Sequence, residues 1–177
     1  MEKEILLSDS RVVIRNFNPS DITDEYISWL NDGEVVKYSG QRFLSHDQAS
    51  AVRYLDSFAG TCNLFLIITD SVTGESIGTL TVYRQLHHRV ADVGIMIGNR
   101  RFWGQGLGLA SWMLVISFLV NELGVRKVTA GTIRSNKPML AIMKNSGMRC
   151  EAVLPGQQLL NGEPEDVLLY AKYALIG

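Results

Sequence analysis

The sequence predicts an α/β (α+β) fold in which a mixed β-sheet is flanked by helices. Helical and strand patterns are interspersed along the 177 residues, and strand–helix–strand units occur late in the chain. No linker rich in Pro, Gly or Ser and no internal repeat interrupts them. We therefore expect a single domain over residues 1–177.

The N-terminal third is expected to form one strand and two helices. Residues 11–17 alternate and are rich in β-branched side chains, which predicts a strand. A turn at residues 18–21 leads to a helix over 21–30. A second helix, ending near residue 58, begins at Ser45, because Gln48 follows at the spacing of a capping box.

Three strands are predicted next, over residues 63–69, 76–84 and 89–97. The first of these is apolar on both faces, since Leu64 and Leu66 alternate with Phe65 and Ile67. This pattern is typical of a strand at the centre of a sheet.

The C-terminal part begins with a helix over residues 106–123, which is apolar nearly all round and therefore expected to be buried. A strand at 126–132 precedes a helix at 136–146, which has Pro138 in its first turn and Gly147 at its end. Residues 149–153 and 167–175 are predicted to be closing strands, with a turn at Asn161-Gly162.

Composition and charge argue against several kinds of protein. With 46% hydrophobic and 20% charged residues, the chain is too apolar to be disordered. A net charge of −1 argues against nucleic acid or an anionic membrane as partner. The longest apolar run, residues 110–120, is too short to span a bilayer, and no signal peptide is recognisable, so we expect a cytoplasmic location. Cys62 and Cys150 are isolated, and we expect neither a metal nor a disulfide.

The charge is distributed unevenly along the chain. Residues 1–60 contain 10 acidic and 6 basic residues, a balance of −4, whereas residues 61–177 contain 8 and 11, a balance of +3. Two interpretations are open. The charges simply form solvated faces, or an acidic part attracts a cation while a basic part holds an anion.

Three alternate glycines, Gly104, Gly106 and Gly108, lead into the buried helix. Glycine permits positive φ and a close approach of the backbone, so successive N–H groups can point into one concavity. The helix start adds a partial positive charge, and Arg100 and Arg101 stand in the preceding turn. The pattern indicates a diphosphate-binding loop, in preference to a helix start that uses glycine only for packing.

Two other phosphate-binding loops do not match. Gly106-Leu107-Gly108 lacks the Gly-Lys-Ser/Thr ending of a P-loop. The dinucleotide fingerprint fails because Leu109 or Ser111 stands where its third glycine belongs. Nucleotide hydrolysis and nicotinamide-dependent hydride transfer are therefore disfavoured.

The loop residues 101–106, Arg-Phe-Trp-Gly-Gln-Gly, resemble the pyrophosphate loop of the GNAT superfamily of acyl-CoA-dependent N-acetyltransferases. The Trp-Gly-x-Gly form resembles the branch that includes the ribosomal-protein-alanine N-acetyltransferases. Asn136, Gly147 and the stretches 29–32, 34–35 and 77–79 look like the same pattern, whereas Met148 departs from the family's Phe. The resemblance covers nearly the whole chain.

The resemblance implies a cleft between two parallel strands, over residues 92–97 and 127–132, that splay apart and hold acetyl-CoA as co-substrate. No metal is implied. The free edge of the first strand, the glycine loop and the start of a later helix would contact the coenzyme. These residues are Ile95, Met96, Ile97, Arg101, Phe102, Trp103, Gly104, Gln105, Gly106, Leu107, Gly108 and Asn136.

The acceptor amine must lose a proton before it attacks the thioester. Many family members use a carboxylate at the start of the splayed strand, and Asp92 stands there, on the face shared with Gly94 and Met96. Its alternative role is that of a solvated residue at a strand edge. His88 is a second candidate base, beside the simpler interpretation of His87 and His88 as an ordinary turn pair.

The departing thiolate needs a proton in return. Family members often supply it from a tyrosine, but Met143 stands at that position here. Water, Tyr83 and bulk solution remain as alternative sources.

In this fold the acceptor site would be formed by the two N-terminal helices, residues 32–43 and the closing hairpin around residues 157–165. Residues 128–132 and 146–148 look similar to relatives from amino-sugar pathways, which favours an amino-sugar nucleotide or another small amine as acceptor. A protein N-terminus and a non-catalytic acyl-CoA-binding module are the alternatives. An edge strand near the C-terminus would allow a homodimer.

Overall fold

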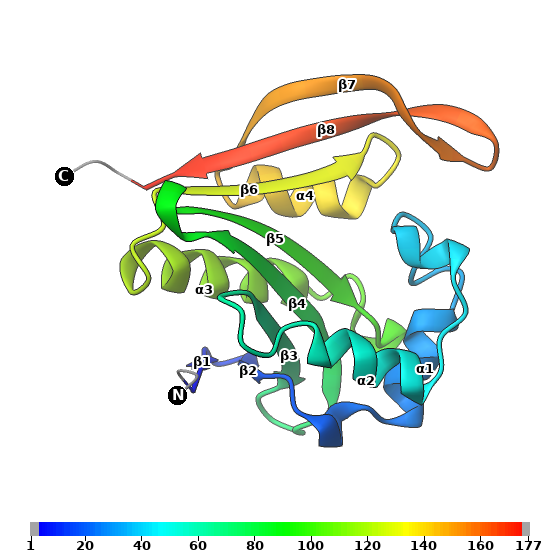
Figure 1. Ribbon diagram of the computed structural model, residues 1–177, viewed down its shortest axis with the longest axis vertical. Coiled ribbons are helices and arrows are strands. Elements are labelled where there is room, and N and C mark those ends of the chain that lie inside the picture. The colour runs from blue at the N-terminus through cyan, green and yellow to red at the C-terminus, as the bar shows by residue number, and fades with distance from the viewer. Residues whose placement is uncertain (1–3, 175–177) are drawn as a thin grey trace.

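The computed structural model describes residues 4–174 and has one mixed sheet of eight strands (Figure 1). The spatial order is β1-β2-β3-β4-β5-β6-β8-β7, and of the neighbouring pairs only β5 and β6 run parallel. The strands are β1 Leu6–Ser8, β2 Val12–Asn16, β3 Leu64–Asp70, β4 Ser76–Gln85, β5 Val90–Ile97, β6 Lys127–Ile133, β7 Arg149–Leu160 and β8 Glu163–Tyr173. This architecture confirms the predicted fold class.

Helices cover both faces of the sheet. The α-helices are α1 Asp24–Asn31, α2 Gln48–Asp56, α3 Leu107–Asn121 and α4 Lys137–Asn145, and the short 3₁₀ turns are η1 Pro19–Asp21, η2 Gly40–Phe43, η3 Leu86–His88 and η4 Arg100–Phe102. The two faces of β3 show how the layers form. Leu66 and Ile68 pack in the core under α3, while Phe65 and Ile67 pack with α1 and α2. The prediction of a central strand apolar on both faces is confirmed.

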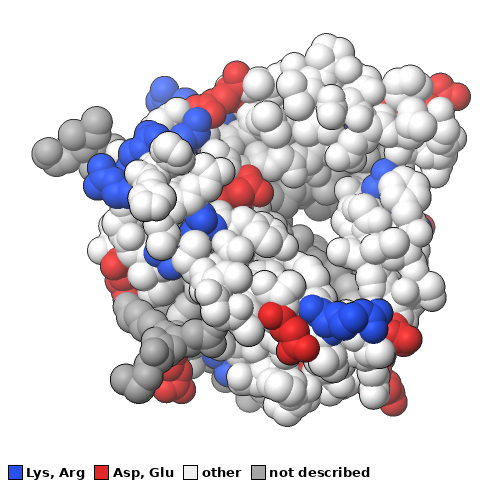
Figure 2. All heavy atoms as spheres, in the orientation of Figure 1, with Lys and Arg blue, Asp and Glu red and all other residues white. Residues whose placement is uncertain are grey.

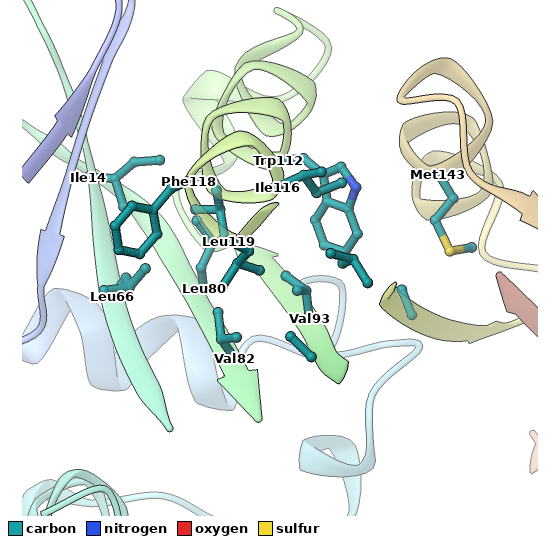
Figure 3. Packing of buried hydrophobic residues seen from close by; sticks show 14 of the residues in the cluster. Ile14, Leu66, Leu80, Val82, Val93, Trp112, Ile116, Phe118, Leu119 and Met143 are labelled. Atoms are coloured by element: carbon teal, nitrogen blue, oxygen red, sulfur yellow. The ribbon is translucent and has the colours of Figure 1, made fainter. Parts of the chain in front are cut away.

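Helix α3 is the centre of the larger core. Trp112 and Leu119 on this helix are fully buried, and Figure 3 shows Leu119 beside Leu80 of β4 and Trp112 on the side of Val93 of β5. Met143 of α4 is also fully buried. Burial of this much apolar surface fixes the helix on the sheet and so fixes the loop that leads into it.

Two predicted helix starts are wrong. Helix α1 begins at Asp24 with Thr23 as its N-cap, because the Asp21 carboxylate is bound at 2.7 and 2.8 Å by the Arg15 guanidinium and ends a separate 3₁₀ turn. Helix α2 is capped by Asp47 with Ser50 as its reciprocal partner, not by the pair at residues 45 and 48. In both cases a polar residue two positions further along the chain caps the helix.

The strands of the closing hairpin are longer than the sequence predicts. They reach the turn at Asn161-Gly162, but register shifts on β7 between Cys150 and Ala152 and between Leu154 and Gln158 break the alternation of side chains. The three-residue strand β1 was not predicted. The predicted end of the last strand, at residue 175, lies outside the described residues.

The parallel pair β5–β6 opens into a V. Register partners are Val90–Lys127, Ala91–Val128 and Asp92–Thr129, and pairing ends there although β5 runs on to Ile97 and β6 to Ile133. Figure 1 shows the two strands diverging. The edge of β5 that faces β6 therefore lacks a strand partner beyond Asp92, as the family resemblance implied.

Within residues 4–174, no helix has the length and apolarity needed to cross a membrane. Nor does this part of the chain contain a group of three His, Cys, Asp or Glu side chains suited to a metal ion.

Candidate active site

The loop between β5 and α3 presents unpaired backbone donors. Gly104 and Gly106 adopt φ of +73° and +77°, the left-handed region that only glycine enters at little cost. The N–H groups of residues 104–109 donate to no acceptor in the part of the chain that the structure describes. Together with the N-terminal dipole of α3, these donors form a concave anion-binding site.

Side chains hold this loop against the end of β5. The indole Nε1 of Trp103 donates to the Ile97 carbonyl at 2.8 Å, and Gln105 Nε2 donates to the Arg101 carbonyl at 2.7 Å. Asn99 caps η4 through the Arg101 N–H at 3.2 Å. The shape of the loop is thus set by the protein itself before any ligand binds.

The two arginines of the loop are already paired. Arg100 lies 3.4 Å from Asp32, and Arg101 lies 3.1 Å from Glu75. Both pairs are solvent-exposed and therefore weak. The loop can draw on these charges only in competition with the two carboxylates.

Arg11 is a basic residue of the site that the sequence did not reveal. Its Nη1 lies 3.7 Å from the point that a Cβ on Gly106 would occupy. Among the described residues its carboxylate neighbour is Asp9 at 3.9 Å, and half of its side chain is exposed. No sequence signal connects Arg11 with a loop about ninety residues away.

Close packing turns two side chains of the loop, Phe102 and Leu107, toward the core. Leu107 is buried and Phe102 packs against the larger core. A Cβ on Gly108 would lie 3.2 Å from Ile142 of α4 and 3.4 Å from Ile97. These residues can therefore reach a ligand only through their backbone.

The predicted strand-edge residues lie where β5 has lost its partner. Ile95 and Ile97 pack toward α3, while Met96 packs with the cluster under α1 and α2. Asn136 caps α4, accepting from the Met139 N–H at 3.2 Å and donating to Thr132 at 2.9 Å. Its amide therefore orders the start of α4.

Asp92 lies at the apex of the V, where the parallel pairing ends. It is the register partner of Tyr83 on β4 and of Thr129 on β6. The Thr129 hydroxyl donates to the Asp92 carboxylate at 2.6 Å. Although one side of Asp92 is open to solvent, loss of water around the carboxylate raises its pKa, and the hydrogen bond from Thr129 partly opposes this. A carboxylate with a raised pKa at the apex of the V suits proton transfer.

Tyr83 lies beside Asp92 on the same face of the sheet. Its hydroxyl is 3.1 Å from the hydroxyl of Tyr54 on α2, and its ring packs near Phe58. Burial is the main cause that raises the pKa of Tyr54, and the hydrogen bond with Tyr83 raises it further. The structure thus brings together two of the predicted catalytic residues, Asp92 and Tyr83.

The third, His88, lies apart from them. It belongs to the exposed turn η3 together with His87, in agreement with the interpretation of the two histidines as a turn pair. Its backbone carbonyl accepts from Arg126 at 2.8 Å, while its imidazole makes no hydrogen bond with any described residue. Met143, at the position where the family often has tyrosine, is a buried core residue.

The segments expected to form the acceptor side meet at the open end of the V. Arg42 of η2 donates to the Leu159 carbonyl on β7 at 2.8 Å. Figure 1 shows η2 near the β7–β8 turn, and Figure 2 shows the surface hollowed between the helical layer and the β6–β8–β7 part. A pocket of about 470 Å³ lies at this junction.

Comparison with known proteins identifies the family. Residues 11–149 match the family model described as an acetyltransferase (GNAT) domain. The chain belongs to the GNAT acetyltransferase family. A curated relative of this GNAT chain, the uncharacterized protein MJ1062 of Methanocaldococcus jannaschii, is 20% identical over 147 residues. The match covers 80% of this chain but only 28% of the length of that relative.

Solved structures share the GNAT fold of the chain. The spermidine N-acetyltransferase of Vibrio cholerae, solved with CoA and spermine, superposes with a TM-score of 0.83 at 15% identity, over 94% of this chain and 97% of that one. RimL, a ribosomal L7/L12 α-N-protein acetyltransferase solved with coenzyme A, gives 0.84 at 14% identity, over 96% and 98%. Two relatives with such different acceptors share this fold, so the fold by itself leaves the acceptor open.

Proposed function

We propose that this GNAT chain transfers the acetyl group of acetyl-CoA directly to a primary amine. One observation carries the proposal: the unpaired N–H groups of residues 104–109 adjoin the unpartnered edge of β5. The first feature fits a diphosphate, and the second fits the amide-containing arm of the coenzyme. The backbone of residues 102–108, the edge at 95–97 and the region of Asn136 would hold it.

Bound acetyl-CoA would supply an activated thioester. The chain would supply polarisation, because N–H groups on the open edge of β5 can donate to a thioester carbonyl as charge develops on its oxygen. Asp92 would accept the proton that the ammonium group must lose before its nitrogen can attack. The free amine then forms the N–C bond, the C–S bond breaks to release the thiolate, and the nitrogen loses its second proton to solvent. Tyr83 or solvent would return a proton to the thiolate.

A small amine, with an amino-sugar nucleotide as the favoured example, fits the acceptor side. The bond between Arg42 and the Leu159 carbonyl joins η2 to β7 across the open end of the V. This bridge narrows the approach for the N-terminus of a folded protein. We propose that the reaction takes place in the cytoplasm. We also propose that β7, which lies at one edge of the sheet, can pair with a second copy of the chain.

Thermal unfolding with acetyl-CoA tests the coenzyme site. Ligand at about 100 times its Kd adds about 2.7 kcal/mol of stability. For a chain of this size, that corresponds to a rise in Tm of about 5–10 °C. Gly104→Val should abolish most of this rise by placing a side chain over the donors.

Gly124→Val is the matched control. Gly124 also has positive φ, +65°, and open space around its Cβ position, but it follows the far end of α3. It should lower the Tm to a similar extent while keeping the shift with acetyl-CoA. If neither acetyl-CoA nor a longer acyl-CoA shifts the Tm of the native chain, the coenzyme assignment is wrong. Release of free CoA with a panel of amines then tests the transfer, and binding without release on any amine supports a non-catalytic module.

A further inference from the structure

The pocket at the open end of the cleft contains positive charge that the reaction at Asp92 does not use. Its lining includes two cationic side chains, Lys37 and Arg42, and no carboxylate. Two of its apolar side chains, Phe43 and Leu159, are 71% and 55% exposed. Exposed apolar groups beside fixed charges are the usual composition of a ligand site.

Lys37 is the cation free to meet a ligand. Its ammonium group lies 3.7 Å from the Glu34 carboxylate, too far for a hydrogen bond, and both side chains are largely exposed. Such a pair contributes little and can be exchanged for a better partner. An anion entering the pocket would meet the ammonium group with Glu34 as its competitor among residues 4–174.

Arg42 has a different part in the pocket. Its two terminal nitrogens donate to the carbonyls of Ser39 at 2.6 Å and Leu159 at 2.8 Å, and its guanidinium lies over the Phe43 ring. Carbonyl partners fix the side chain without cancelling its charge. The pocket therefore has a rigid positive wall beside the mobile charge of Lys37.

The pocket and the Asp92 side chain lie on the same side of the sheet, the side covered by α1 and α2. Asp92 and Tyr83 face α2 through Tyr54, and residues 32–47, which contain Lys37 and Arg42, connect α1 to α2. Asp92 and the pocket lie at opposite ends of the V, because Asp92 is at its apex and the pocket is at its open end. At about 3.3 Å per residue, β5 extends roughly 16 Å from Asp92 to Ile97.

We propose that this pocket binds a phosphate or carboxylate group at the far end of the acceptor, so that the substrate is an elongated amine with an anionic tail. The inference rests on the proposed function, since it assumes that the amine reacts near Asp92. It distinguishes this chain from an enzyme for polycationic amines, which two cations at the pocket would repel.

A series of ω-aminoalkyl phosphates of increasing length, each beside its ω-amino alcohol, tests the pocket. With acetyl-CoA, kcat/KM for the phosphate should exceed that for the alcohol by about 10- to 100-fold once the chain spans the cleft, the effect of one charge-assisted hydrogen bond. The ω-amino acids test whether a carboxylate serves as well. Equal use of phosphates and alcohols at all lengths, or preference for spermidine, overturns the inference.

Charge variants test whether Lys37 causes the preference for aminoalkyl phosphates over amino alcohols. Lys37→Gln should reduce the preference for phosphates, because it should lower kcat/KM for each aminoalkyl phosphate more than for the amino alcohol of the same length. Glu34→Gln should strengthen the preference, because it removes the competing carboxylate. Arg149→Gln is the matched control, an exposed cation at the start of β7, and should change neither value. A loss with Lys37→Gln that is equal for both substrates contradicts the inference.

A binding measurement separates the two proposals. An aminoalkyl phosphate is titrated calorimetrically into the protein saturated with CoA, so that the glycine loop cannot capture the phosphate. Binding that weakens in Lys37→Gln supports the pocket even when no amine is acetylated, an outcome that contradicts the transferase instead. Absence of binding overturns the pocket, while turnover of neutral amines would leave the proposed function in place.

Discussion

The Thr129 hydroxyl donates a 2.6 Å hydrogen bond to the Asp92 carboxylate, and the same two residues are the last register pair between β5 and β6. A side-chain bond thus closes the cleft at the point where the backbone ladder ends. The bond opposes the rise in pKa that loss of water imposes on Asp92. The geometry of the apex and the protonation of the candidate base are therefore coupled.

Thr129→Val should raise the pKa of Asp92 further, because it removes the donor that stabilises the carboxylate and adds an apolar group. Since the base must be ionised, the acid limb of kcat/KM against pH should move to higher pH, with a smaller change at the plateau. Thr129→Ser keeps the hydroxyl and should retain the native profile. An acid limb that stays in place in Thr129→Val would show that Asp92 is not the titrating base.

Asp92→Asn should lower activity and raise stability at neutral pH. The pKa of Asp92 is raised in the folded chain, so its contribution to stability is present below the ordinary Asp pKa of about 3.8 and is lost as pH rises through the folded value. Asparagine has no charge to desolvate. The gain in Tm should amount to a few degrees at most, because solvent reaches the carboxylate and screens it.

Thermal unfolding of Asp92→Asn and of the native chain, at neutral pH and again near pH 4, measures whether the substitution raises or lowers the Tm. The difference in Tm should be larger at neutral pH. A difference that is constant across pH would mean that the substitution acts through packing. A loss of Tm at neutral pH would contradict the desolvation of this carboxylate.

Arg11→Gln should weaken binding of CoA by about tenfold, the effect of one charge-assisted contact to a phosphate. Because Arg11 lies beside Gly106 at the start of α3, we expect it to contact the diphosphate. Binding of dephospho-CoA, which lacks the 3′-phosphate, should then be weakened by Arg11→Gln to the same extent. Calorimetric Kd values for both ligands check this, with Arg53→Gln on the exposed face of α2 as control. A loss seen with CoA alone would assign Arg11 to the 3′-phosphate, and no loss would remove it from the site.

The features that the sequence predicts well are those written in local patterns. The two-faced apolar run of β3 and the all-round apolar α3 indicate buried elements whatever their partners are. The alternate glycines are readable because Gly104 and Gly106 need positive φ. Asp92 is a candidate because the family resemblance points to the start of this strand, and the alternation of the strand gives the face on which it lies.

What the sequence does not predict depends on competition or on contacts between distant segments. Thr23 and Asp47 each cap a helix whose start was expected two residues earlier, at Asp21 and Ser45. Pro155 and Gly156 lie within the irregular part of β7, so alternation fails although the strand continues. The approach of Arg11 to Gly106 is a product of sheet order, because β2 and the loop after β5 are brought together only by the fold.

Tyr83→Phe tests the source of the thiolate's proton. If the Tyr83 hydroxyl donates that proton, its removal should lower kcat by about 100-fold or more, while the ring still packs near Phe58. Tyr54→Phe is the control, because it removes the hydroxyl that lies 3.1 Å from that of Tyr83 but leaves the Tyr83 hydroxyl in place.

Single-turnover rates with acetyl-CoA and a reactive amine separate this chemical step from product release. A large loss in Tyr83→Phe together with a small loss in Tyr54→Phe assigns the proton to Tyr83. Equal small losses assign it to solvent, which is the outcome expected if burial of Met143 at the family's tyrosine position reflects a reaction that needs no dedicated acid. Equal large losses would mean that the two hydroxyls act as a pair, with Tyr54 positioning Tyr83 through their shared hydrogen bond.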